Sequence, residues 1–211
     1  MHRTVAVVLT LCSLALIGPA CAAAQDATPS AVGGEVIDPS ECQVEPRSTD
    51  ELIGLLYMED EAGTPVAATP EPRPAVTSVS VPLGAPADAA TVAGVTVTTR
   101  EILACVNAGD FRRGLALYSD KLVLEFRPDP GETSEETRAS LEIAPEPVPV
   151  EQRARLIAIT DVSVMQDGRV GALVVTSDLE NPVEPPETVL ILFAEEGGRW
   201  LADDVVVFTV S

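Results

Sequence analysis

The sequence predicts an α+β fold, with helices packed on one antiparallel sheet, from two observations. First, four apolar, β-branched segments follow one another near the C-terminus, and Asp-Gly and Gly-Gly turns of the kind found in hairpins separate two pairs of them. Second, helical periodicity precedes these segments. We expect strands at about Ala154–Met165, Arg169–Ser177, Thr188–Glu195 and Trp200–Val210.

Two of these strands are apolar throughout, over Val170–Val175 and Val189–Ala194. A sheet that is wet on one face alternates apolar and polar residues, whereas a sheet covered on both faces does not. We therefore expect the centre of the sheet to be buried on both faces. A second element must then cover the face that the helices leave open.

Ahead of the sheet, the sequence predicts a long helix over Ala89–Val106, capped by Asp88 and stopped by Asn107-Ala108-Gly109. Shorter elements follow: a helix over Phe111–Tyr118, a strand over Leu122–Phe126, a helix from a Thr133/Glu136 capping box to about Leu141, and a proline-rich loop over Ile143–Val150. A single domain spanning residues 87–211 would contain all of these elements and would have an ordinary size.

Residues 1–24 have the pattern of a signal peptide. A basic start precedes an apolar run over Val5–Ile17, shorter than the ~20 residues that span a bilayer, and Ala22-Ala23-Ala24 suits cleavage. Cys21 allows a second interpretation, a lipoprotein acylated at this cysteine, but Pro19 fits that signal poorly, so the sequence favours plain secretion. Either route predicts an exported protein, extracellular or in the cell envelope, that meets a membrane only if Cys21 is lipidated.

Residues 25–86 are predicted to form an extended leader. Gln25–Asp38 is small and polar, as in a flexible tether, and Met58–Ala85 is a Pro-, Ala- and Thr-rich linker. Between them, Ser48-Thr49-Asp50-Glu51 is a capping-box pattern that opens a short amphipathic helix over Thr49–Tyr57. We expect this helix to lie on the sheet or on the long helix; the alternative is a lone helix of marginal stability.

Charge and histidine content limit the function classes. The chain has 33 Asp and Glu against 13 Lys and Arg, a net charge of −20, which repels nucleic acid. His2 is the only histidine and lies in the predicted signal peptide, so the mature chain has no imidazole for a Ser-His-Asp or Cys-His mechanism or for a metal site. Phosphate-binding loops, Cys-x-x-Cys pairs and calcium loops are absent from the sequence, and we predict no cofactor and no metal.

Four cysteines lead to one predicted disulfide. Cys12 lies in the signal peptide, and Cys21 is either removed with it or acylated. Cys42 and Cys105 are then left in an oxidising compartment, where disulfides persist, so we expect a bond that pins the leader helix to the domain. The alternative is that Cys105 is a buried free thiol.

Ile102–Phe111 and Gly114–Asp120, together with the last predicted hairpin at Glu195–Asp204, carry a family resemblance. They resemble the nuclear transport factor 2-like superfamily, which includes ketosteroid isomerases and polyketide cyclases. The chain is also similar to secreted bacterial proteins with a Cys-containing leader ahead of such a domain. The resemblance covers residues 87–211 and implies a cone-shaped fold that pairs as a homodimer through its sheet, with the leader helix as the competing cover.

The resemblance implies a cavity in the cone but no particular activity. Family enzymes use an acid–base residue there, often Asp or His with Tyr. Tyr118, Glu125 and Trp200 are our candidate pocket residues, although Trp200 also suits a core anchor; Asp203 and Asp204 are expected on opposite faces of a strand and therefore not as a carboxylate pair. We predict no catalytic residue and an exported domain that binds a small apolar ligand or a protein partner. The alternative is an isomerase, cyclase or hydrolase that uses carboxylates in the cone.

Overall fold

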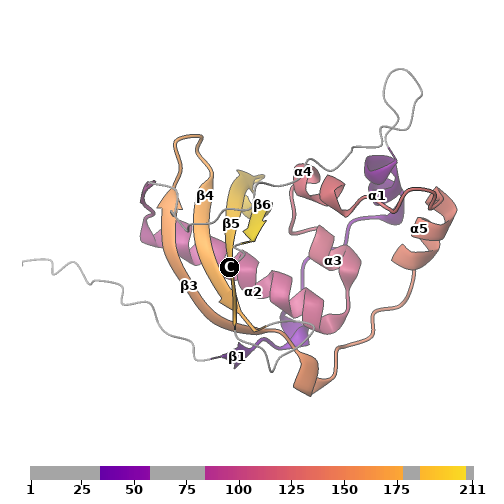
Figure 1. Ribbon diagram of the computed structural model, residues 1–211, viewed down its shortest axis with the longest axis horizontal. Coiled ribbons are helices and arrows are strands. Elements are labelled where there is room, and N and C mark those ends of the chain that lie inside the picture. Colours follow the sequence, from indigo (N-terminus) through magenta and orange to yellow (C-terminus); the bar gives the residue numbers. More distant parts are fainter. Residues whose placement is uncertain (1–33, 58–83, 178–185, 208–211) are drawn as a thin grey trace, which may run out of the picture.

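The computed structural model describes residues 34–57, 84–177 and 186–207 (Figure 1). In chain order, the elements of these ranges are β1 (Glu35–Val36), the 3-10 helix η1 (Pro39–Glu41), α1 (Thr49–Leu56), β2 (Ala85–Pro86), α2 (Ala89–Ala108), α3 (Phe111–Leu115), α4 (Asp120–Val123), η2 (Leu124–Phe126), α5 (Ser134–Leu141), η3 (Val150–Gln152), β3 (Arg155–Val164), β4 (Val170–Thr176), β5 (Glu187–Glu196) and β6 (Arg199–Val207). The predicted signal peptide, Cys21 and most of the predicted linker lie outside the described residues.

The predicted α+β class is confirmed, and the sheet is open and antiparallel. Its strand order is β1-β3-β4-β5-β6, and β2 pairs with the same edge of β3 as β1 does. Strands β3 to β6 are the four predicted strands, each paired with the next. Gly168 in the first predicted turn and Gly197 and Gly198 in the second all have positive φ, as those hairpins require. Figure 1 shows the sheet curving past α2.

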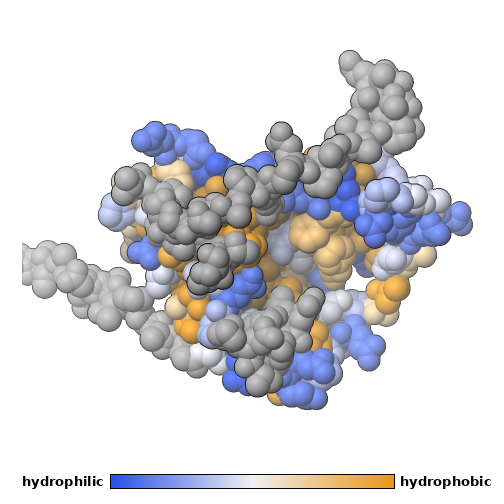
Figure 2. Space-filling view, viewed as in Figure 1, coloured by the Kyte–Doolittle hydropathy of each residue, from blue (hydrophilic) through white to orange (hydrophobic). Residues whose placement is uncertain are grey.

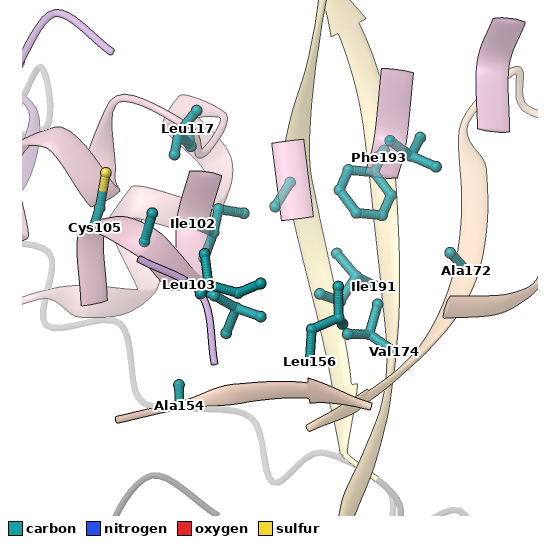
Figure 3. Close-up of a cluster of buried hydrophobic side chains, with 14 of the residues drawn as sticks. Ile102, Leu103, Cys105, Leu117, Ala154, Leu156, Ala172, Val174, Ile191 and Phe193 are labelled. Carbon is teal, nitrogen blue, oxygen red and sulfur yellow. The ribbon is translucent and has the colours of Figure 1, made fainter. Parts of the chain in front are cut away.

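Helix α2 covers one face of the sheet. Figure 3 shows Ile102 of α2 in the cluster of apolar side chains that also holds Ile191 and Phe193 of β5. Leu190 and Leu192 are buried as well but lie on the other face, because side chains alternate along a strand. The centre of the sheet is therefore buried on both faces, as predicted. By length and composition alone α2 would also suffice to cross a membrane, but a helix in a protein core passes the same test.

Residues 34–57 belong to the folded domain and not to a leader outside it. Ile37 is buried in the main core, and β1 pairs with the start of β3. The Nδ2 group of buried Asn107 donates to the carbonyl oxygens of Ile37 and Ala154, and its Oδ1 accepts from the N–H of Ala154. The expectation of a flexible tether is therefore wrong for residues 34–38, because an apolar side chain and a buried amide hold this segment in the core.

Helix α1 confirms the predicted leader helix but packs in a different place. The Ser48 hydroxyl accepts from the N–H of Glu51, as expected, whereas the Glu51 carboxylate pairs with Arg47. Leu52 and Leu56 form a second, smaller core with residues of α3, α4 and α5. Helix α1 thus packs on these helices rather than on the sheet or α2, and it is not the element that covers the second face of the sheet.

The predicted strand at Leu122–Phe126 is wrong, because α4 and η2 occupy this stretch. The Ser119 hydroxyl accepts from the N–H of Leu122 and starts α4. Leu122 and Val123 are adjacent and both buried, which a helical turn between two packed layers allows and an alternating strand does not. Helix α3 also ends at Leu115, three residues earlier than predicted, and the chain then runs beside β6.

Candidate functional site

A cavity of about 310 Å³ opens between the C-terminal end of α2, helix α3 and the chain that leads into η2. Its walls include Cys105, Gly109, Phe111, Leu115, Tyr118 and Phe126. These residues come from helices and connecting turns and not from strands. Figure 2 shows apolar side chains beside a hollow in the region where Figure 1 places α3 and α4. The pocket is therefore not formed between helices and sheet, where the family resemblance led us to expect a cavity.

Three aromatic rings form the outer part of the pocket. The rings of Tyr118 and Phe126 are stacked, with centroids 5.6 Å apart and planes 12° apart, and Phe111 meets Phe126 edge to face at 6.2 Å. Phe111 is 55% exposed and Phe126 is 44% exposed. The whole chain has two Tyr, four Phe and one Trp, so nearly half of its aromatic residues meet here. Contiguous exposed apolar surface is typical of binding sites, because leaving it in water costs about 25 cal/mol per Å².

Turn and capping residues place Phe111 at the mouth of the pocket. Gly109 ends α2 in the left-handed region at φ 65°, and a Cβ there would lie 2.2 Å from the carbonyl oxygen of Glu146, so only glycine fits. Asp110 then caps α3: its carboxylate accepts from the N–H of Arg113 and pairs with the Arg113 guanidinium at 3.2 Å. Helix α3 therefore begins at Phe111, directly beside the end of α2.

Backbone pairing with β6 fixes Tyr118. The N–H of Ser119 donates to the carbonyl oxygen of Ala202 at 2.8 Å, and the N–H of Ala202 donates to the carbonyl oxygen of Leu117 at 2.9 Å. The guanidinium of Arg47, which precedes α1, donates to the carbonyl oxygen of Tyr118. Burial raises the pKa of the Tyr118 hydroxyl, which is therefore protonated at neutral pH.

The Cys42–Cys105 disulfide lies in the wall of the pocket. The two Sγ atoms are 2.07 Å apart, at bonding distance, in agreement with the predicted bond and not with a free thiol at Cys105. The guanidinium of Arg113 donates to the carbonyl oxygen of Cys42 at 3.0 Å. The chain ahead of α1 is thereby tied both to α2 and to α3, the two helices that form the pocket.

Of the three predicted pocket residues, only Tyr118 lines the pocket. Trp200 of β6 packs on the N-terminal half of α2, where a Cβ at Gly94 would lie 2.4 Å from its ring. The carbonyl oxygen of Trp200 accepts from the Thr98 hydroxyl, so this residue is an anchor between α2 and β6. Glu125 lies in η2 and is not among the residues that line the pocket.

Sequence reasoning missed Phe111 and Phe126 as pocket residues. The sequence predicts only that Phe111 begins a helix and that Phe126 ends a strand, and that strand does not form. The one signal available was composition: aromatic residues are scarce in this chain, yet one lies on each side of Tyr118 within nine residues of it.

Asp203 and Asp204 contact the same two cations, which corrects the expectation that they lie apart on opposite faces of a strand. The register of β5 and β6 shifts at this point, and Asp203 is the extra residue of a β-bulge, which redirects its side chain. The Lys121 Nζ lies 3.4 Å from the carboxylate of Asp203 and 3.0 Å from that of Asp204. The Arg169 Nη1 lies 3.1 Å and 4.0 Å from the same two carboxylates.

This charge cluster ties α4 to β6. Burial opposes ionisation of Asp203, but hydrogen bonds from Ser119 and Arg169, together with the charge of Lys121, outweigh burial and lower its pKa below the ordinary value. Burial also disfavours the charge of Lys121, yet its bonds to the two carboxylates raise its pKa. A carboxylate with a lowered pKa is ionised at neutral pH, so Asp203 has no proton to donate and is a weak base.

Neither metal-binding geometry nor similarity to known proteins gives a second basis for inferring the function. Within residues 34–57, 84–177 and 186–207, no three His, Cys, Asp or Glu side chains are grouped so as to hold a metal ion. Comparisons with protein-family models, with curated proteins and with solved structures found no match for this chain. Function is therefore inferred from the pocket.

Proposed function

We propose that this chain is an exported, non-catalytic domain that binds a small apolar ligand in the pocket between α2, α3 and η2. One observation carries the proposal: Phe111, Tyr118 and Phe126 converge on a concave site that stays open to solvent, in a chain poor in aromatic residues. The cavity volume of about 310 Å³ lies at the lower end of the range for ligand pockets, about 300–1,000 Å³. The ligand is therefore small.

A small molecule fits this site better than a protein partner does. A stable protein–protein interface takes about 800 Å² of surface from each partner. Two exposed phenylalanines and one largely buried tyrosine around a hollow offer far less apolar surface than that. The pocket therefore supports the small-ligand half of the sequence-based prediction more than binding of a protein partner.

The arrangement favours binding over acid–base catalysis. An enzyme of the expected type needs a carboxyl group in an apolar surround that raises its pKa. Within the described ranges, the buried polar residues are Thr49, Thr98, Thr99, Asn107, Ser119, Thr137 and Ser177. Asp110, at the pocket, is paired with Arg113 and caps a helix, and the hydroxyl of Tyr118 holds its proton.

The cone-shaped, nuclear transport factor 2-like fold and the export of the chain are parts of the same proposal. The fold is supported by the order of a long helix, short helices and an antiparallel meander that curves past α2. Export is supported by the signal-peptide pattern at the start of the sequence and by the paired cysteines, since disulfides persist in oxidising compartments.

The fluorescence of N-phenyl-1-naphthylamine, a neutral apolar probe, tests ligand binding directly. We expect saturable enhancement with the purified protein and a Kd about fivefold weaker, or more, in Phe111→Ala, because the variant loses apolar contact area at the mouth. Val97→Ala is the matched control: Val97 lies on α2, is 61% exposed and is not among the residues that line the pocket. It should bind the probe as the unaltered protein does.

Equal unfolding midpoints would show that both variants fold. Absence of saturable enhancement, or equal affinities for the unaltered protein and Phe111→Ala, would contradict the proposal. Enhancement lost equally in both variants would place the probe elsewhere on the surface, which is also contrary to it.

A further inference from the structure

We infer that the pocket selects flat aromatic rings over saturated groups of the same size. This inference rests on the proposed function, because it specifies the chemical class of the ligand for the same site. Two observations support it: the exposure of the side chains that line the pocket, and the orientation of the three rings.

Phe111 and Phe126 are the most exposed apolar side chains in the lining of the pocket. Leu115 and Cys105 are 1% and 0% exposed, so the chain itself already covers them. Phe111 and Phe126 are 55% and 44% exposed, and a ligand would bury this surface first. Val106, the remaining aliphatic side chain of the lining, is half-buried, so an aliphatic ligand would find less aliphatic than ring surface.

The distribution of aromatic residues supports the same conclusion. In the described ranges, the main core is built from aliphatic residues, and Phe193 is the one aromatic residue fully buried in it. The mouth of the pocket differs from this core, because its exposed side chains are the rings of Phe111 and Phe126. Rings contribute more to a contact than their apolar area.

That additional contribution is directional. An aromatic ring has a negative face and a positive edge, so rings prefer offset-stacked or edge-to-face contacts, which add about 0.5–1.5 kcal/mol per pair beyond burial, or about two- to tenfold in affinity. Tyr118 and Phe126 lie within 12° of parallel, and Phe111 stands at 77° to Phe126. The site thus has rings in both orientations, and a flat ligand ring can join either arrangement, whereas a saturated ring gains only from burial.

Two ligands with one carbon skeleton test this selectivity. The affinities of 2-naphthalenemethanol and its decahydro counterpart are measured by displacement of N-phenyl-1-naphthylamine. We expect the aromatic alcohol to bind the unaltered protein about three- to tenfold more tightly. In Phe126→Leu, which keeps an apolar side chain and removes the ring, we expect the ratio of the two Kd values to fall towards one.

The ratio separates selectivity from general damage, because lost area weakens both ligands alike. Val97→Leu is the control and should leave the ratio unchanged. If Phe126→Leu does not fold, Phe111→Leu, at the more exposed ring, serves in its place. If the probe itself shows no saturable binding, the proposed function fails; if the probe binds and neither alcohol displaces it, ligand binding stands and the selectivity inference is overturned. If both bind with equal affinity to the unaltered protein, or if the ratio survives loss of the ring, ligand binding stands and the selectivity inference is overturned.

Discussion

Removal of the Cys42–Cys105 disulfide should lower the free energy of unfolding by about 4 kcal/mol. The bond joins residues 63 positions apart. In the chain-entropy relation, a loop of this length removes about 14 cal/mol/K from the unfolded ensemble, or about 4 kcal/mol at 25 °C. The folded state should survive, because Ile37 in the core and the Asn107 hydrogen bonds hold the same segment independently of the sulfurs.

Urea unfolding followed by far-UV circular dichroism measures this loss in Cys42→Ala/Cys105→Ala. For a slope of about 2 kcal/mol per M, the midpoint should fall by about 2 M. The unaltered protein, reduced fully while unfolded and then refolded with reductant, should give the same midpoint as the double variant. A loss below about 1 kcal/mol would refute the reasoning, because it would mean that the unfolded chain is already constrained without the bond.

Three further predictions concern the charge cluster, a strained residue and the assembly. Asp203→Asn should cost about 1–2 kcal/mol at pH 7, since Lys121 and Arg169 lose a charged partner. Because the pKa of Asp203 is lowered on folding, its contribution is present above the ordinary value of 3.8 and is lost as pH falls through the folded value. The urea midpoints of the variant and the unaltered protein should therefore converge as the pH falls below 3.8, and a difference that stays constant with pH would contradict this. Asp161 lies in β3 at φ 54°, a backbone angle that glycine adopts more readily than alanine. The variant Asp161→Gly should therefore be about 1 kcal/mol more stable to urea than Asp161→Ala, whereas glycine is the less stable choice at an ordinary strand position. Equal urea midpoints for the two variants would show that the backbone at Asp161 is unstrained. We also propose that the open sheet pairs as a homodimer, as the family resemblance implies; sedimentation at high micromolar concentration should give twice the chain mass, and a monomer would exclude it.

Local signals made most of the secondary structure predictable. Asp88 caps α2, and Thr133 and Glu136 form both halves of the capping box that opens α5. The Gly168 and Gly197-Gly198 turns fixed the hairpins, because their φ angles are positive. In each case the residues that determine the local structure lie within four positions of one another. At that separation the order of residues in the sequence already determines which of them are neighbours in space.

Apart from the Cys42–Cys105 bond, which follows from the cysteine count, contacts between distant parts of the chain were not predictable from the sequence. The bulge at Asp203 depends on how β5 and β6 align, and Lys121, which contacts both carboxylates, is 82 residues away. Leu122 and Val123 are residue types that favour a strand, but the Ser119 hydroxyl caps a helix at this point. Leu122 is then buried in the main core and Val123 in the second core. At these positions side-chain packing and the helix cap outweigh the strand propensity of the residues.

The pocket could not have been predicted from residues 87–211 alone, because residues 42–47 hold it in place. Cys42 is bonded to Cys105 in its wall, and the carbonyl oxygen of Cys42 accepts from Arg113, which also pairs with the cap of α3. Arg47 holds the carbonyl oxygen of Tyr118. These contacts join residues more than 60 positions apart, so no local pattern encodes them. A chain that begins at residue 87 would leave α3 and Tyr118 without these supports, so the shape of the aromatic site depends on a segment outside the domain that the sequence predicts.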